Sequence, residues 1–242
     1  MLTDRAEVLR ARFVELAPEG FEEAEAPGGI ELAAYGPAAD RVLAAFPDAF
    51  VTAVEDGWED RWREFHHSVT IGPLWVGPPW EVPPVGAIAV VVDPGRAFGT
   101  GAHPSTRLAL ELLLDEEPGG LLDVGCGSGV IAIAAAKLGF APVTAVDVDE
   151  TAVEVTRANA VDNGVRVEAR TADARERELP AADLAVANIT LELVEVAGPA
   201  METTRLITAG YLATDRPSLP GFTHLRRAER DGWAADAFSR SR

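Results

Sequence analysis

The feature that most constrains the fold is a regular alternation of short apolar strands with helical segments from residue 87 onward. Mainly apolar runs at Ile88–Val92, Leu121–Val124 and Val143–Asp147 are typical of strands buried on both faces of a parallel sheet. Helical stretches such as Val130–Leu138 and Glu150–Ala160 separate them. The pattern predicts an α/β fold with a mostly parallel, doubly wound, Rossmann-like sheet. Further elements are expected at Arg107–Leu114 (helix), Val165–Ala169, Leu184–Ala187 and Tyr211–Thr214 (strands).

The sharpest local signal is a glycine-rich turn between the strand at Leu121–Val124 and the next helix. Its residues are Gly125, Cys126, Gly127, Ser128 and Gly129. The glycines allow a tight turn and let a ligand approach the backbone. Asp147 ends the next strand, 22 residues after Gly125, where a carboxylate can accept hydrogen bonds from both ribose hydroxyls of an adenosine ligand.

Several ligand classes compete for this turn. Its spacing is Gly-x-Gly-x-Gly, whereas a dinucleotide site favours Gly-x-Gly-x-x-Gly, and the lysine of a phosphate-binding P-loop is absent. Asp123, in the preceding strand, fits a ligand carrying an ammonium or sulfonium better than one carrying phosphates. A glycine turn that binds no ligand is the remaining alternative. Cys126 has no histidine beside it in sequence, so we assign it no catalytic role.

A second glycine-containing stretch, Asp93-Pro-Gly-Arg-Ala-Phe-Gly-Thr-Gly-Ala-His-Pro-Ser-Thr-Arg107, precedes this turn. Ser105 and Thr106 can cap the helix that follows. A loop of this kind can close over a cofactor and exclude water. His103, within the loop, is either a functional group or a histidine satisfied by nearby backbone.

Together these motifs resemble the ribosomal protein L-eleven methyltransferase family (PrmA) of class I S-adenosylmethionine-dependent methyltransferases. The resemblance runs from about Trp58 to Tyr211 and also includes Val146-Asp-Val-Asp149, Arg157-Ala-Asn-Ala-Val-Asp-Asn-Gly-Val165 and Val186-Ala-Asn-Ile189. It implies S-adenosylmethionine as cofactor. It also implies a basic ribosomal protein as substrate, methylated on lysine side chains and the N-terminal amine.

The resemblance also implies site residues. Thr106, Gly125, Asp147 and Asn188 correspond to cofactor-binding positions, and Asp173 to the position beside the adenine amine. Asn188 ends a strand, where open α/β sheets bind ligands, so we favour a functional role over capping of the next helix. The predicted catalytic residues are Asn188, His103 and Thr100. The predicted cofactor-binding residues are Phe98, Gly99, Thr106, Asp123, Gly125, Gly127, Ser128, Gly129, Asp147, Val148, Asp173 and Asn188.

Composition divides the chain into three parts. Residues 1–57 are interpreted as a small α+β domain for substrate recognition, residues 58–86 as a linker rich in Trp and Pro, and residues 87–242 as the catalytic domain. Three features depart from the family: Thr190 replaces a usual leucine, the small domain lacks a first strand, and Asp215–Gly221 stands where a long helix is usual.

The charge balance and cysteine content limit the partners. With 21 Lys and Arg against 39 Asp and Glu, the net charge is −18, which disfavours direct nucleic-acid binding and would attract a basic partner. One cysteine excludes an internal disulfide framework, and we predict no metal site. We see neither a signal peptide nor a membrane-spanning stretch and expect a cytoplasmic protein; the oligomeric state stays open.

Three functions are compatible with the sequence. The first is methylation of ribosomal protein L-eleven. The second is methylation of another protein lysine or a small amine by a related class I enzyme. The third is binding of S-adenosylmethionine without turnover.

Overall fold

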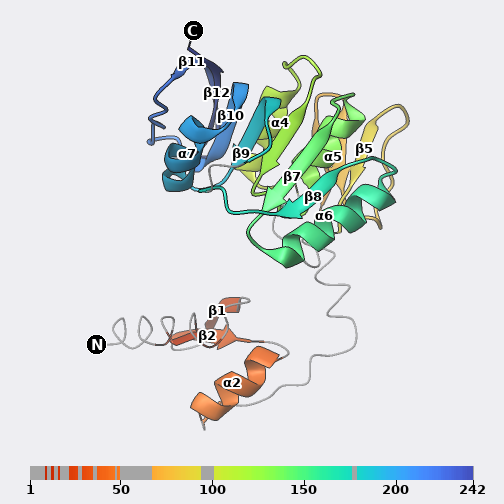
Figure 1. Cartoon of the computed structure of the whole chain (residues 1–242). Helices are drawn as coiled ribbons and strands as arrows, with labels where there is room; N and C mark the ends of the chain where they lie inside the picture. Colours follow the sequence, from red (N-terminus) through yellow and green to blue (C-terminus); the bar gives the residue numbers. More distant parts are fainter. Residues whose placement is uncertain are drawn as a thin grey trace. The chain divides into compact units, whose positions relative to one another are not determined.

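The structure is a computed structural model that describes residues 9, 12–13, 16, 22–26, 29–34, 37–46, 48–49, 67–93, 101–175 and 179–241. The chain divides into two compact units, Met1–Trp58 and Glu59–Arg242 (Figure 1). In the smaller unit β1 (Glu22–Ala26) and β2 (Gly29–Ala33) pair antiparallel, and α2 (Pro37–Ala45) follows. The sequence also predicts a first helix at Asp4–Leu16 and a strand at Phe50–Val54; the strand and most of the helix lie outside the described residues.

The larger unit contains a seven-stranded sheet in the order β11-β12-β10-β9-β6-β7-β8. The five neighbouring strands from β8 to β10 pair in parallel, whereas β12 runs antiparallel to both β10 and β11. This topology confirms the predicted Rossmann-like fold class. The strands are β6 (Leu121–Val124), β7 (Val143–Asp147), β8 (Glu168–Thr171), β9 (Ala182–Asn188), β10 (Thr203–Leu212), β11 (Phe222–Arg230) and β12 (Trp233–Arg240).

Apolar side chains from alternate strand positions build one core on each face of this sheet. Leu121 belongs to the cluster that includes α4, α5 and α6, and Leu122 belongs to the cluster that includes α7, because successive strand residues point to opposite faces. Figure 1 shows these helices around the sheet. The helices are α4 (Pro104–Leu113), α5 (Val130–Lys137), α6 (Glu150–Asp162) and α7 (Leu191–Ala197), the last continued by the short 3-10 helix η1 (Gly198–Ala200).

A separate three-stranded sheet corrects one prediction. The run at Ile88–Val92 was expected in the main sheet, but β5 (Ile88–Val91) pairs in parallel with β4 (Leu74–Gly77), which pairs with β3 (Val69–Ile71). Part of the predicted linker is therefore strand within the larger unit. Asn163 holds the free edge of β5, since its side chain accepts a hydrogen bond from Val91 N (2.9 Å) and donates one to Val91 O (2.6 Å).

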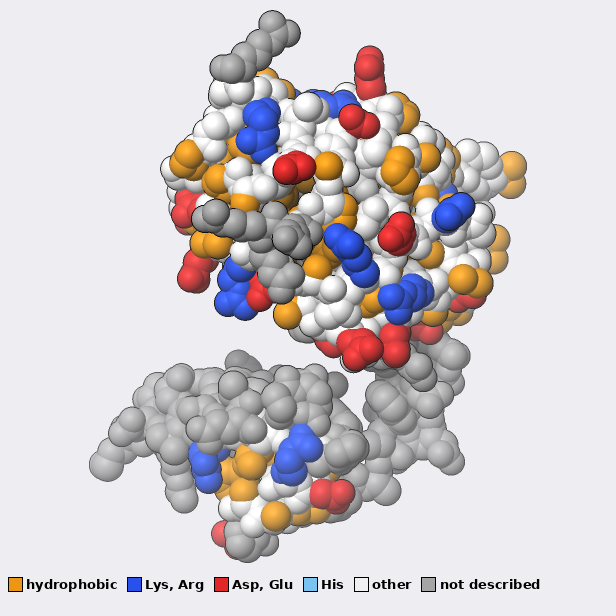
Figure 2. All heavy atoms as spheres, viewed as in Figure 1, with side chains coloured by type: hydrophobic (Ala, Val, Ile, Leu, Met, Phe, Trp, Pro, Cys, Tyr) orange, Lys and Arg blue, Asp and Glu red, His pale blue; other side chains and the backbone are white. Residues whose placement is uncertain are grey.

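Ion pairs fasten the end of α4 to the last strands of the main sheet. Arg205 of β10 contacts Glu116 at 2.7 Å, and Arg230 of β11 contacts Glu111 at 2.7 Å. Figure 2 shows that acidic and basic side chains are interspersed over the visible face of the larger unit. Within the described ranges, no helix combines the length and apolar character needed to cross a membrane.

Candidate functional site

The candidate site lies where β6, β7 and β9 end. The last residues of these strands are Val124, Asp147 and Asn188, and parallel strands present their carboxyl ends at one edge. In open α/β sheets this edge, outside the strand ends, is where ligands bind.

The glycine turn and the acid at the end of β7 contact each other directly. Gly127 N donates to Asp147 Oδ2 at 3.0 Å, and Asp149 N donates to Asp147 Oδ1 at 3.1 Å. Each carboxylate oxygen therefore keeps acceptor capacity for a further donor. The half-buried Asp147 thus has the capacity to accept hydrogen bonds from the ribose hydroxyls, a contact that stays a prediction.

Helix α6 supports the glycine turn from below. Asn159 Nδ2 donates to Ser128 O at 2.8 Å, and Thr156 Oγ1 donates to Gly127 O at 3.0 Å. Ser128 is fully buried, and a Cβ on Gly129 would lie 2.9 Å from Thr156 Cγ2. The sequence at these two positions is thus restricted by helix packing, whichever ligand the turn holds.

Asp123 lies beneath the turn, 1% exposed, with Oδ2 accepting from Ala132 N at 3.0 Å. Its Oδ1 atom is buried and has no hydrogen-bond partner among the described residues. Burial raises the pKa of this carboxyl from 3.8 to about 7; the Ala132 hydrogen bond opposes the shift and the nearby Asp147 charge adds to it. Such a carboxyl exchanges a proton near neutral pH and can respond to a cation placed above it.

Thr106 and Asn188 form a second pair at the same edge. Asn188 Nδ2 donates to Thr106 Oγ1 at 3.1 Å, and Asn188 Oδ1 is buried without a partner among the described residues. The cap of α7 is Thr190, so Asn188 does not cap that helix. An orphaned buried acceptor is costly unless a ligand completes it, which makes Asn188 Oδ1 a candidate acceptor for a substrate N–H.

Ile189 connects the glycine turn after β6 with Asn188. Gly125 has a φ of +74°, and a Cβ there would lie 2.3 Å from Ile189 Cγ2. Only glycine fits both the left-handed backbone and this approach. The turn after β6 therefore packs directly on the residue that follows Asn188.

His103 has a structural role at the start of α4. Its side chain caps the helix: Nδ1 lies 2.8 Å from Ser105 Oγ and accepts from Ser105 N at 3.3 Å. Its ring packs edge-on against Trp233, with centroids 4.6 Å apart. The other predicted loop residues, Phe98, Gly99 and Thr100, lie outside the described residues.

Asp173, predicted beside the adenine amine, is engaged by a neighbour. Arg175 Nε contacts both carboxylate oxygens, at 2.9 and 3.0 Å, and Arg175 NH2 contacts Oδ2 at 2.5 Å. These hydrogen bonds lower the pKa of Asp173 to about 2. Val148, also a predicted cofactor residue, is 69% exposed beside Asp147, as an apolar contact for a base would be.

Cys126 is buried, and burial raises the pKa of its thiol to about 12. Thr156 Oγ1 donates to its sulfur at 3.3 Å. A protonated, buried thiol is a poor nucleophile, in agreement with the absence of an assigned role. In the parts of the chain that the structure describes, no cluster of His, Cys, Asp and Glu could hold a metal ion.

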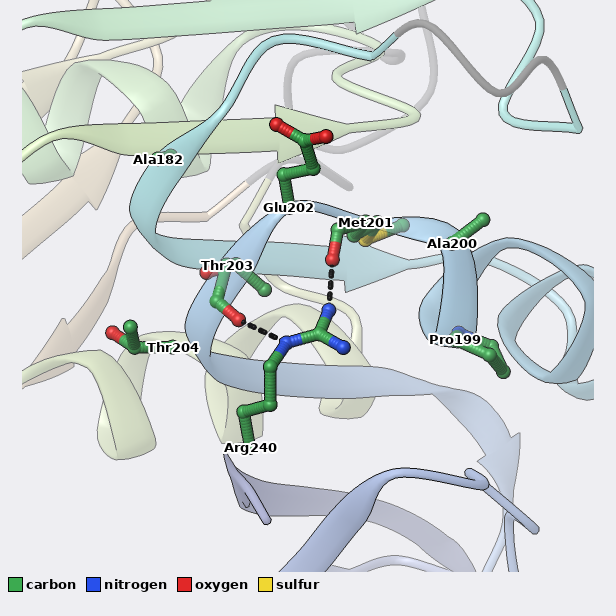
Figure 3. Close-up of a pocket in the computed structure, with 8 residues that line it drawn as sticks. All are labelled: Ala182, Pro199, Ala200, Met201, Glu202, Thr203, Thr204 and Arg240. Atoms are coloured by element: carbon green, nitrogen blue, oxygen red, sulfur yellow. Dashed lines mark hydrogen bonds between the residues drawn. The ribbon is translucent and has the colours of Figure 1, made fainter. Parts of the chain in front are cut away.

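An open pocket lies at the opposite edge of the sheet. Figure 3 shows it where β9 and β10 begin and β12 ends, with Arg240 donating to Thr203 O (2.8 Å) and to Met201 O. The Arg240 guanidinium also stacks on the Phe222 ring at 4.5 Å. These contacts satisfy the arginine structurally, and none of the predicted site residues lines this pocket.

Sequence reasoning missed three residues at the carboxyl edge. Ile189 belongs to the motif Val186-Ala-Asn-Ile189 but had no predicted role. Its position directly after Asn188 could have indicated that it affects the site. Arg175 follows Asp173 by two residues, which is close enough for the ion pair to have been considered. Trp233 lies 130 residues after His103, and no local pattern joins them.

Comparisons with known proteins identify the family. The profile of the family described as "Ribosomal protein L11 methyltransferase (PrmA)" matches residues 36–239. A protein of that name from Myxococcus xanthus is 38% identical over 217 residues, covering 81% of this chain and 74% of the relative. One from Shewanella pealeana is 45% identical over 165 residues, covering 65% of this chain and 54% of the relative. The chain therefore spans about half the length of several curated relatives.

A solved structure shows the same fold. The crystal structure of ribosomal protein L11 methylase from Lactobacillus delbrueckii subsp. bulgaricus superposes with a TM-score of 0.64 at 28% identity, covering 73% of this chain and all of that one. The family match and the fold similarity thus agree. The chain belongs to the ribosomal protein L11 methyltransferase (PrmA) family.

Proposed function

We propose that this protein is an S-adenosylmethionine-dependent methyltransferase that acts on amines of ribosomal protein L11. Family membership supports the reaction and the substrate. The observation that carries the proposal is Asn188 Oδ1, next to Thr106 at the carboxyl edge of the sheet; this oxygen is buried and has no hydrogen-bond partner among the described residues. It supplies an acceptor for an amine N–H where the cofactor's methyl group must arrive.

The residues present fit the cofactor. Asp147 has spare acceptor capacity for two hydroxyls, and Val148 offers an exposed apolar surface beside it. The buried Asp123 places a titratable carboxyl beneath the turn. One of its oxygens has no hydrogen-bond partner in the described part of the chain, which favours a ligand carrying positive charge. Asp173 can receive the adenine amine once Arg175 releases it.

When bound, S-adenosylmethionine supplies a methyl group on a sulfonium, an electrophile that is already activated. The protein's task is to hold a neutral amine in line with that group. A free lysine has a pKa of about 10.4, so its ammonium must lose a proton before it can react. Asn188 Oδ1 orients the amine by accepting its N–H, Thr106 fixes the Asn188 amide, and the partly enclosed edge disfavours the ammonium form.

Recognition of L11 is assigned to the smaller unit, Met1–Trp58. The site residues above all belong to the larger unit, and their proposed roles concern the cofactor and the reacting amine, not a protein surface. The net charge of −18 suits a basic protein partner, and a ribosomal substrate implies action in the cytoplasm.

The test is methylation of purified L11 with labelled S-adenosylmethionine, read by mass spectrometry of the product. Methyl groups on lysine and N-terminal amines of L11 are expected. Labelling of other lysate proteins or small amines, but not of L11, would favour a related methyltransferase. Cofactor binding in calorimetry with no labelled product from any of these would favour a binding module without turnover.

A further inference from the structure

The strand next to β9 contains a bulge at the level of Asn188. Asn188 is the last residue of β9 in register with β10, opposite Ala209. Directly afterwards the pairing of β10 with β12 shifts between Ala209 and Tyr211, which leaves Gly210 out of the ladder. Bulges of this type bend a strand and re-aim its neighbours, and they are frequent beside active sites.

Gly210 rests against the peptide group that follows Asn188. Its φ is +99°, and a Cβ there would lie 2.3 Å from Ile189 O and 3.0 Å from Ile189 N. The atoms in contact are backbone and cannot rotate away as a side chain could. Together with Gly125, which approaches Ile189 Cγ2 from the turn after β6, Gly210 holds Ile189 between two close contacts.

A buried polar cluster fixes the other side of the bulge. Tyr211 OH donates to Asp236 Oδ2 at 2.8 Å and lies 2.7 Å from Thr208 Oγ1. Asp236 is 1% exposed and also accepts from Arg227 NH1 at 3.0 Å, while His224 Nε2 lies 2.7 Å from its Oδ1. The tyrosine is thereby held in place, and the bulge cannot shift along β10 without breaking these contacts.

We propose that Gly210 is a positioning residue for methyl transfer: the bulge, anchored by Tyr211 and Asp236, sets the backbone at Ile189 and so aims the Asn188 amide at the substrate amine. The inference rests on the proposed role of Asn188. Gly210 itself touches neither cofactor nor substrate in this scheme. Its effect must therefore reach the reaction through Asn188.

The experiment compares Gly210→Ala with Gly221→Ala in the full chain. Gly221 also has a positive φ, +85°, but a Cβ there would meet nothing within 4 Å, so it reproduces the backbone strain without the contact on Ile189. For Gly210→Ala we expect kcat to fall by about tenfold or more, with the Kd for S-adenosylmethionine changed by less than about threefold. For Gly221→Ala both quantities should stay near wild type.

A second readout follows the Asn188 side-chain amide by ¹⁵N–¹H NMR, with Asn188→Ser to assign its signals. Gly210→Ala should move these signals and Gly221→Ala should not. Unmoved signals together with an unchanged kcat would overturn the proposal. If Gly210→Ala does not fold, Tyr211→Phe takes its place, because it removes the anchoring hydroxyl and should shift the same signals. The NMR result tests whether Gly210 positions the Asn188 amide even if the wild type methylates nothing. Absence of methylation by the wild type would contradict the proposed function and not the role of Gly210.

Discussion

At the residue scale, Asp123 and Asp173 show how different surroundings give two carboxyl groups of one predicted site very different pKa values. Asp123 is buried, one of its oxygens has no partner among the residues that the structure describes, and burial raises its pKa to about 7. Asp173 is held by a fork of hydrogen bonds from Arg175, and its pKa falls to about 2. Asp123 can therefore hold a proton near neutral pH, whereas Asp173 is an ionised partner in an ion pair with Arg175.

Asp123 is expected to make stability and cofactor binding depend on pH. Its pKa is raised in the folded state, so its contribution to stability is full below pH 4 and is lost as pH rises to about 7. A bound cation favours the carboxylate, so affinity for S-adenosylmethionine should increase through pH 6–8, as calorimetry would measure. In Asp123→Asn both trends should flatten; identical pH profiles in the two proteins would contradict the assignment.

Arg175→Ala tests whether Asp173 binds the adenine amine. Removing the guanidinium frees both carboxylate oxygens, and we expect affinity for S-adenosylmethionine to rise by about two- to fivefold, the scale of an exposed ion pair. Asp173→Asn should weaken binding instead. Calorimetry on both variants decides it: if neither changes the Kd, Asp173 does not contact the adenine.

At the scale of elements, the start of α4 carries both a helix cap and a site residue. His103 caps the helix and Thr106, one turn later, contacts Asn188. His103→Ala should cost about 1 kcal/mol of stability through the lost cap. His103→Asn, which can cap, should recover it, as thermal unfolding would show.

The same pair of variants separates capping from catalysis. If His103 acts only through the cap, His103→Asn keeps the wild-type kcat for L11. A kcat that drops strongly in His103→Asn despite normal stability would support the predicted catalytic role instead.

The elements also show what could be predicted from sequence. The strands at Leu121–Val124 and Val143–Asp147 were predicted correctly because short, mainly apolar runs between helical segments are typical of buried strands. β10 was expected at Tyr211–Thr214 but spans Thr203–Leu212, since its first residues are polar. Phe222–Arg230 was missed as β11 because most of its residues are polar or charged and none is buried, so it shows no apolar face.

The candidate site was also predictable only where its residues are marked by local sequence patterns. The glycine turn, Asp147 and Asn188 each sit at a strand end, so their meeting at one edge follows from parallel pairing. The contacts of Gly210 with Ile189 and of His103 with Trp233 depend on tertiary packing between distant segments. No periodicity encodes such contacts, and the sequence could not reveal them.

At the scale of the whole molecule, the chain divides into two units at Trp58, and we expect this division to separate cofactor binding from substrate choice. The unit Glu59–Arg242 holds every described site residue, so deletion of residues 1–57 should leave the Kd for S-adenosylmethionine nearly unchanged. Methylation of L11 should be lost. L11 methylation by the truncated protein at the full-length rate would show that the smaller unit is not the recognition module.

The order of strands at the end of the sheet has a consequence for synthesis on the ribosome. β12 follows β11 in the chain, yet it lies between β10 and β11. While residues 233–240 are still inside the exit tunnel, the edge of β10 has no partner, and β11 has nothing to join. The nascent chain thus exposes an open, largely apolar strand edge, a template for intermolecular pairing, until β12 emerges and inserts.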